Sequence, residues 1–436
     1  MSARMASRAL CPWRGVAHEN ALLQRGFREA SALVARGALD DAGSTFAQRS
    51  ELILSAGPHD LRISLDAQLL HRMTVACKCP ETSIGKRADV TTKTPLTGQV
   101  ALVAGATRGA GRGIARALAE AGAVVYCTGR SAAGHPKGMD RPETLDETVA
   151  LIEKADGRAV AARVDHTREE QVASLAARVR SEAGRLDVLV NSIWGADPML
   201  NWEQRFWEVD LAEIRAYLDQ TLVSHVITNR HLAPLIVEAD RGLIVEVIDG
   251  HFAGYRGHIL YDLVKASLTR LAYGMALELA RTGVVALSLS PGFLRSEAVL
   301  EHFGVREENW RDAIAKDPYF AESETPWLVG RAVAALAADP NVRRKAGLIH
   351  FASDLAREYG FTDIDGRVPN FPSMLDAKVK EIASAPPMDG NGRFLVWARY
   401  CQIHLDPARR ELACLLAKAL GLEGLGPGLA PASERS

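Results

Sequence analysis

The 436-residue sequence has no excess of charge of either sign, because 52 lysines and arginines face 53 aspartates and glutamates. A balanced chain carries no overall electrostatic attraction to nucleic acid or to an anionic membrane surface. The sequence also lacks an uninterrupted apolar run of the length that a membrane span needs. We therefore expect neither a nucleic acid nor a membrane as a partner.

Cysteine is scarce and scattered, at positions 11, 77, 79, 127, 401 and 414. Only Cys77 and Cys79 are close together, and no second Cys/His pair lies nearby to complete a zinc site, so we expect no metal centre. Reduced thiols favour a cytoplasmic protein. An organelle-targeting segment stays open as an alternative, because three arginines precede the first acid, Glu19.

From Thr97 onward, short β-branched runs alternate with amphipathic helical patterns, which is typical of a parallel sheet. A capping-box spacing at Thr167–Glu170 predicts one helix start. The fold class we expect is α/β, a doubly wound sheet of the Rossmann type that binds its ligand at the carboxyl ends of the strands. We expect seven strands, over residues 100–104, 123–128, 159–164, 186–190, 243–248, 284–289 and 347–351.

The chain divides by pattern into three parts. Residues 1–95 form an N-terminal extension that is poorly ordered or unassigned. Residues 96–366 carry the alternating pattern and form the nucleotide-binding catalytic domain. Residues 367–436 form a C-terminal extension with one helix, which Gly421 would end, and a disordered tail.

A glycine-rich turn follows the first strand, in the sequence Ala101-Leu-Val-Ala-Gly-Ala-Thr-Arg-Gly-Ala-Gly-Arg-Gly-Ile-Ala115. Gly105, Gly109 and Gly111 let a pyrophosphate approach the backbone, and the following helix points its N-terminal amides at that phosphate. The spacing Gly-x-x-x-Gly-x-Gly resembles that of the short-chain dehydrogenase/reductase family. The resemblance extends over residues 96–366 and implies a nicotinamide cofactor.

The end of the second strand discriminates between the two nicotinamide cofactors. An enzyme that uses NAD usually places an acid there to bind the ribose hydroxyls. Here the strand leads into Arg130, and no acid follows before Asp140. Arg130 and Arg108 offer positive charge to a 2′-phosphate, so we expect NADP(H), with NAD(H) less favoured. The alternative is that both arginines are solvated surface residues.

The resemblance implies further roles along the chain. Asp165 would bind the adenine amino group or, alternatively, cap its own loop. Asn191 would contact the adenosine ribose, although Ser192-Ile-Trp-Gly195 departs from the family's usual Asn-Ala-Gly. The Pro-Gly turn would hold the nicotinamide carboxamide. The implied cofactor residues are Gly105, Thr107, Arg108, Gly109, Gly111, Arg130, Asp165, Asn191, Tyr261, Lys265, Pro291, Gly292 and Ser296.

Tyr261 and Lys265 form a Tyr-x-x-x-Lys pair, which places both side chains on one face of a helix. A free phenol has a pKa of about 10, and a neighbouring ammonium favours the phenolate. Tyr261 is therefore the predicted general acid/base, with Lys265 assisting. The resemblance supports this role, because the pair follows the fifth strand and precedes the sixth.

Two positions depart from the family pattern. The family's usual serine, 12 or 13 residues before the tyrosine, is replaced by Asp249, and the asparagine of the proton relay by Thr221. An ionised carboxylate cannot donate a hydrogen bond. Asp249 therefore either stays protonated and serves the site or points away, in which case another donor replaces it, with His251, Tyr255 and His258 as candidates.

The leading hypothesis is an NADP(H)-dependent oxidoreductase that acts on a small carbonyl compound or secondary alcohol, with a homo-oligomer as its expected assembly. Aromatic residues within 301–324 indicate an apolar or ring-bearing substrate or, equally, a lid packed on the body. A nucleotide-binding sensor or scaffold with lost catalysis is the alternative from another class. A lyase- or epimerase-like use of the nucleotide stays open because Asp249 could act as a base.

Overall fold

The computed structural model describes residues 50–54, 61–65, 94–135, 141–250, 257–385, 396, 400 and 410–420. The chain separates into two units, residues 1–88 and residues 89–436. In the first unit, the described strands β1 (Ser50–Leu54) and β2 (Leu61–Leu65) pair antiparallel. The rest of the N-terminal extension, including the targeting segment considered above, lies outside the described residues.

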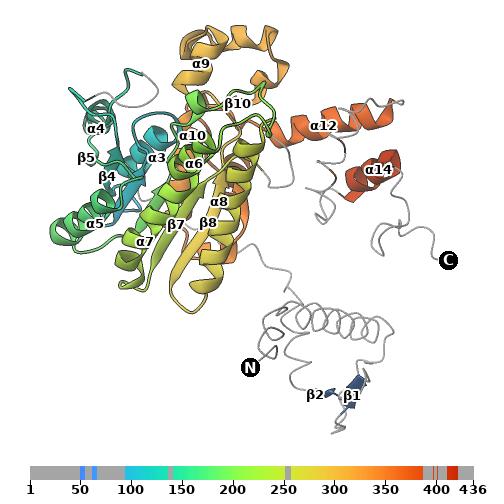
Figure 1. Ribbon diagram of the computed structural model, residues 1–436, viewed down its shortest axis with the longest axis horizontal. Helices are drawn as coiled ribbons and strands as arrows, with labels where there is room; N and C mark the ends of the chain where they lie inside the picture. The colour runs from blue at the N-terminus through green and yellow to red at the C-terminus, as the bar shows by residue number, and fades with distance from the viewer. Residues whose placement is uncertain are drawn as a thin grey trace, which may run out of the picture. The chain divides into compact units, whose positions relative to one another are not determined.

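The second unit is built on a seven-stranded sheet, which confirms the expected doubly wound α/β fold (Figure 1). All pairings within this sheet are parallel, and its order is β11-β8-β7-β6-β3-β4-β5. Strands β4 and β5 follow β3 toward one edge of the sheet, whereas β7, β8 and β11 follow β6 toward the other edge. The direction in which strands are added therefore reverses between the neighbours β3 and β6. Ligands bind at such a switch point. The strands are β3 (Val100–Ala104), β4 (Val124–Gly129), β5 (Arg158–Arg163), β6 (Val188–Asn191), β7 (Gly242–Val247), β8 (Val284–Ser290) and β11 (Ile349–Phe351).

Helices cover both faces of the sheet, because the central strands are buried and apolar on both sides. One face packs against α3 (Gly109–Glu120), α4 (Leu145–Glu153), α10 (Pro326–Ala338) and α11 (Ala352–Tyr359). The other packs against α5 (Glu169–Ala183), α7 (Ser224–Val237) and α8 (Ile259–Glu278). Helices α3 and α10 pack closely, since a Cβ on Gly113 would meet the Pro326 carbonyl oxygen at 2.0 Å.

A separate segment follows the carboxyl end of β8. It contains β9 (Phe293–Leu294), α9 (Glu297–Phe303), η3 (Glu307–Ala315), η4 (Pro318–Glu322) and β10 (Ser323–Glu324). The short strands β9 and β10 pair parallel and close this segment on itself. Figure 1 shows α9 standing beyond the ends of the strands.

Two expectations need correction. The capping box at Thr167 is wrong: α5 begins at Glu169 without a side-chain cap, because the Thr167 hydroxyl donates to Asp165 Oδ1 instead. The C-terminal extension holds more than the expected single helix, since α12 (Phe371–Ser384) precedes α14 (Arg410–Leu420). These two helices share a small apolar core. Of the helices in the described part of the chain, none combines the length and apolarity that a membrane span requires.

Candidate active site

The glycine turn after β3 has the backbone that the sequence suggests. Gly105 (φ +88°) and Gly109 (φ +54°) both lie in the left-handed region. A Cβ on Gly105 would approach the Ser192 carbonyl oxygen to 2.3 Å, and one on Gly111 would approach the Gly105 carbonyl oxygen to 2.1 Å. Only glycine fits this turn, which brings the start of α3 against the loop that follows β6.

Charged side chains surround the start of α3. Arg112 donates to the Thr107 carbonyl and pairs with Glu147 at 3.2 Å. Arg108, whose pKa is lowered by burial despite the opposing charge of Glu143, lies 4.0 Å from the Glu143 carboxylate. Of the two arginines predicted to bind phosphate, Arg108 is therefore already close to a carboxylate of the chain, and Arg112, which the sequence did not single out, is paired as well.

Arg130 follows β4 and reaches toward the loop after β6. A Cβ on Gly195 would lie 2.8 Å from Arg130 Nη2, which shows how closely the guanidinium approaches that backbone. The pKa of Asp165 is lowered overall, although burial alone would raise it. The hydrogen bonds from Thr167 lower it most, and the charge of Arg130 lowers it further. Asp165 accepts from the Thr167 amide and hydroxyl, so it caps its own loop, as the alternative interpretation expected.

Asn191 ends β6 and is completely buried. Its Nδ2 donates to Asn229 Oδ1 at 3.0 Å and to Glu246 Oε1 at 2.7 Å. Its Oδ1 has no hydrogen-bond partner in the structure. A buried carbonyl oxygen without a donor calls for an explanation, and a bound ligand would supply one.

The predicted catalytic residues meet near the carboxyl ends of β6 and β7. The Tyr261 hydroxyl donates to Asp249 Oδ2 at 2.8 Å. Lys265, one turn further along α8, places Nζ 5.5 Å from the centre of the Tyr261 ring. Asp249 therefore faces the tyrosine rather than pointing away. The Ser290 hydroxyl accepts from the Gly250 amide at 2.7 Å and so holds the turn that follows Asp249.

Of the alternative donors to Asp249, His251 and Tyr255 lie outside the described residues. His258 is buried and caps α8, since its Nδ1 accepts from the Leu260 amide at 3.2 Å. Burial lowers the pKa of His258, which agrees with a neutral ring that accepts this bond. His258 thus has a structural role at the start of α8.

Two tryptophans enclose Tyr261. The Trp194 ring packs edge-on against Tyr261 at 5.3 Å, and Lys265 Nζ lies 4.0 Å from the centre of the Trp194 ring. The half-exposed Trp202 approaches Tyr261 from another side at 5.5 Å. Trp194 lies where the sequence departs from the usual loop of the family it resembles, so the departure places an aromatic ring beside Tyr261 and Lys265.

Thr221, at the position of the family's relay asparagine, does not face the site through its hydroxyl. Its Oγ1 donates to the Tyr217 carbonyl at 2.6 Å, one turn back. Thr221 lies within a succession of three helical segments, which are α6 (Leu211–Leu218), a π-helical turn η2 (Asp219–Val223) and α7. The π turn contains Thr221, and such turns often lie at functional sites. Within this turn Gln220 donates to the Trp194 carbonyl at 2.7 Å and so holds the Trp194 loop.

The Pro-Gly turn at Pro291 and Gly292 follows β8. A Cβ on Gly292 would come within 2.8 Å of the Glu324 carboxylate, so a larger residue here would require that side chain to shift. Ser296 caps α9 by accepting from the Val299 amide at 3.3 Å. Its Cβ would lie 3.6 Å from a Cβ on Gly109, which places Ser296 beside the glycine turn.

Glu324 was not singled out from the sequence. Its side chain is completely buried, and burial raises its pKa to about 8. The Gly292 amide and, to a smaller extent, Arg295 oppose this rise in the pKa, whereas the charge of Asp363 adds to it. Neither carboxyl oxygen forms a hydrogen bond of full geometry. At neutral pH Glu324 is therefore mainly protonated beneath the Pro-Gly turn.

A buried polar network behind the site was also missed. Glu246, the second-to-last residue of β7, accepts from Asn191, from Asn229 and from His225 Nδ1 at 2.6 Å. His225 Nε2 contacts the Ile193 carbonyl at 3.1 Å. The network connects the strand end at Asn191 to the loop that carries Trp194. A charged residue within an otherwise apolar strand was the signal that could have revealed it.

His166 joins the end of β4 to α7. Its two ring nitrogens lie 2.7 Å from Thr128 Oγ1 and 2.8 Å from Thr228 Oγ1. Burial, with a smaller effect from His225, lowers its pKa to about 3, so the ring is neutral. The Thr128 carbonyl accepts from the amides of Gly105 and Ala106, which links this contact to the glycine turn.

The aromatic residues of the segment 301–324 pack against one another. Phe303 and Phe320 lie 4.7 Å apart, and Trp310 and Phe320 lie 6.1 Å apart. Phe320 and Trp310 are buried. This packing agrees with the second role expected for these aromatic residues, that of a lid packed on the body of the protein. Phe371, at the start of α12, approaches Phe293 at 6.2 Å beside the Pro-Gly turn.

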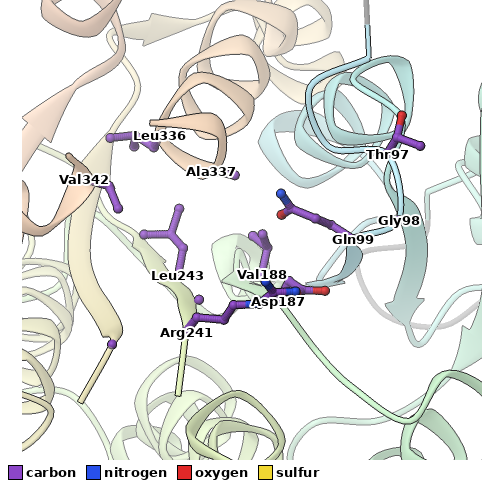
Figure 2. A pocket seen from close by; sticks show the side chains of 12 residues that line it. Thr97, Gly98, Gln99, Asp187, Val188, Arg241, Leu243, Leu336, Ala337 and Val342 are labelled. Carbon is purple, nitrogen blue, oxygen red and sulfur yellow. Dashed lines mark ion pairs between the residues drawn. The ribbon is translucent and has the colours of Figure 1, made fainter. Parts of the chain in front are cut away.

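A hollow at the opposite end of the sheet has a different character (Figure 2). It is lined by residues at the starts of strands, among them Gln99, Asp187 and Gly242, and by residues at the end of α10. Asp187 accepts from the Val100 amide at 2.9 Å and pairs with Arg241 at 3.8 Å, so it ties strand starts together. Parallel sheets of this kind bind ligands at the carboxyl ends, which favours the Tyr261 region as the active site.

Comparison with known proteins agrees with this geometry. The family model described as short chain dehydrogenase matches residues 99–303. Dehydrogenase/reductase SDR family member 1 of Mus musculus is 39% identical over 278 residues, which cover 63% of this chain and 85% of the mouse protein. This chain belongs to the short-chain dehydrogenase/reductase family. Its family is one of oxidoreductases that use NAD(H) or NADP(H) and act on small molecules.

More distant relatives share less of the chain. The 7alpha-hydroxysteroid dehydrogenase of Clostridium sardiniense is 29% identical and covers 48% of this chain and 75% of its own length. Among solved structures, a hydroxysteroid dehydrogenase from Escherichia coli is 22% identical with a TM-score of 0.47. It covers 59% of this chain and 95% of its own chain.

Proposed function

We propose that this family member transfers hydride between NADP(H) and a small carbonyl compound or secondary alcohol, with Tyr261 as general acid/base. The observation that carries the proposal is the 2.8 Å hydrogen bond from the Tyr261 hydroxyl to Asp249. The Tyr261 hydroxyl, which would exchange a proton with the substrate oxygen, is thus in direct contact with the Asp249 carboxyl group. General acid–base help of this kind is worth about a hundred- to ten-thousand-fold in rate.

The two reaction directions use the pair differently. In carbonyl reduction, the Asp249 carboxylate keeps the phenol protonated until a carbonyl oxygen takes the proton from Tyr261. In alcohol oxidation, Tyr261 must first lose its proton, and Asp249 is the acceptor already in contact. Lys265, on the same face of α8, stabilises the phenolate that remains after reduction. The nicotinamide supplies or accepts the hydride when it is bound.

The residues present fit a dinucleotide. The glycine turn is packed so tightly that a Cβ on Gly105 or Gly111 would strike backbone, as in a dinucleotide-binding turn. The buried Asn191 Oδ1 has no donor within the protein, and a ribose hydroxyl would supply one. Arg130 would bind the 2′-phosphate, assisted by Arg108. Asp165 would lie at the adenine, and the Pro291–Gly292 turn with Ser296 at the carboxamide.

The walls of the site favour an apolar or ring-bearing substrate. Trp194 and Trp202 both lie within 5.5 Å of the Tyr261 ring centre, where a substrate must bring its oxygen. Aromatic faces bind flat apolar groups through area and ring geometry.

The direct test is a panel of apolar carbonyl compounds and secondary alcohols, followed through NADPH absorbance, with nucleotide binding measured in parallel by calorimetry. Turnover of at least one panel member with NADPH supports the proposal. Nucleotide binding without turnover across the panel favours the second candidate, a nucleotide-binding sensor or scaffold, which Asp249 at the position of the usual serine supports. Failure to bind either nucleotide refutes both.

We also propose that the protein forms a homo-oligomer through α6 and α8. Several apolar side chains on these helices are exposed, including Leu211 (67%), Leu263 (49%) and Leu277 (60%). Exposed apolar side chains mark an interface when they gather on one surface. Light scattering should give a mass of at least two chains, and a Leu263→Glu variant should reduce that mass to one.

A further inference from the structure

Glu297 makes a long-range contact at the start of α3. It is the first residue of α9, and its Oε2 accepts from the Gly109 amide at 2.8 Å. Its Oε1 lies 3.4 Å from Arg112 Nη1. The contact joins the segment after β8 to the glycine turn, across 188 positions in the sequence.

The contact has the chemistry of phosphate binding. The amide at the N-terminus of a helix and a neighbouring guanidinium together attract an anion. Helix α3 supplies no anion of its own, because its first turn contains no acid and its N-cap, Arg108, forms no side-chain cap. The Glu297 carboxylate is thus the anion that this helix start holds in the structure.

A second contact ties the same helix to the cofactor side of the molecule. Glu301, one turn after Glu297, accepts from Arg141 Nη1 at 2.5 Å, and Arg141 also pairs with Glu143 at 2.8 Å. Glu143 in turn lies near Arg108. Helix α9 is therefore held against the cofactor loops by two carboxylates, of which only Glu297 contacts the glycine turn.

We propose that Glu297 occupies the place of the cofactor's pyrophosphate in the cofactor-free protein and must be displaced when the dinucleotide binds. The proposal rests on the nucleotide binding proposed above. A carboxylate and a pyrophosphate are both anions, so they compete for Gly109 and Arg112. Glu297 is thus a positioning residue that lowers nucleotide affinity and holds α9 until the cofactor is loaded.

The test compares Glu297→Gln with Glu301→Gln by calorimetry with NADP⁺ and, separately, with inorganic pyrophosphate. Glutamine keeps the length of the side chain but removes its charge. The two variants match, because each neutralises one carboxylate of α9 while Glu301 does not contact the glycine turn. Each charge-assisted bond contributes more than a neutral one, so we expect Glu297→Gln to bind both ligands at least about tenfold more tightly, and Glu301→Gln less than about threefold.

Hydrogen exchange in α9 gives an independent readout. Amides of residues 297–303 should exchange faster when NADP⁺ is added to the unaltered protein, because the Glu297 contact is lost. In Glu297→Gln they should be fast already and respond little to NADP⁺. Together with the affinity gain, this pattern supports the proposal.

Unchanged or weaker binding by Glu297→Gln overturns the proposal, and so does an equal gain in both variants. If the unaltered protein binds nucleotide but Glu297→Gln shows no gain, the displacement is wrong and the proposed function survives. If neither the unaltered protein nor a folded variant binds NADP⁺ or NAD⁺, the proposed function fails as well.

Discussion

Replacing Glu324 by glutamine should make the protein more stable, and the gain should grow with pH. The buried carboxyl has a pKa of about 8 in the folded chain, against an ordinary value of 4.5. Between these values the unfolded chain has lost the proton and the folded chain still holds it. Stability therefore falls as pH rises through this window. One pKa unit corresponds to about 1.4 kcal/mol, so the loss attributable to Glu324 between pH 5 and pH 8 is on the order of 3 kcal/mol.

The assay is urea unfolding followed by tryptophan fluorescence at pH 5, 6, 7 and 8. Other titrating groups cancel when the free energy of unfolding of the unaltered protein is subtracted from that of Glu324→Gln. We expect this difference to increase by about 3 kcal/mol over the range. Glu153→Gln is the control, because Glu153 is exposed and its difference should stay flat. A flat difference for Glu324→Gln would refute the argument that Glu324 is a protonated, poorly solvated carboxyl.

Three further predictions concern the site. His166 has a pKa of about 3 when folded and 6.5 when unfolded, so the free energy of unfolding falls as pH drops below 6.5. In urea titrations, His166→Gln should remove about 2 kcal/mol of the stability lost between pH 7 and pH 5, and an unchanged loss would contradict the neutral buried ring. Arg130→Asp should abolish a preference for NADPH over NADH of at least about tenfold in calorimetric Kd, and equal values before substitution would refute the cofactor assignment. Asp249→Ser should retain substantial NADPH-dependent turnover, and Asp249→Ala should lose most of it. Loss of turnover in both variants would indicate an essential base, and wild-type rates in both would place the aspartate outside the reaction.

The periodic part of the fold could be predicted from the sequence. Each buried strand is a short apolar run, and each neighbouring helix has one apolar face, so the order of elements follows from local pattern. The Thr167 capping box failed because α5 begins one residue later than the spacing predicts, with Arg168 at the N-cap, and the Thr167 hydroxyl donates to Asp165 in the preceding loop. Helix α12 was missed because its apolar face is completed only by α14.

The site was predictable where a motif carries its own geometry. The spacing of Tyr261 and Lys265 places them together on any helix, whereas the contact between Tyr261 and Asp249 depends on how β7 meets α8. Glu297 could not be found in this way, because its partner lies 188 positions away and nothing local marks it. Long-range contacts between charged groups leave no periodic signal in a single sequence.

The central claim is that Tyr261 carries the proton, and Tyr261→Phe tests it most directly. The substitution removes one hydroxyl and keeps the ring that packs against Trp194 and Trp202. With a carbonyl substrate from the panel, we predict that the rate of NADPH oxidation falls at least about a hundredfold while the calorimetric Kd for NADPH changes less than about threefold. Turnover by Tyr261→Phe at close to the unaltered rate would contradict the account.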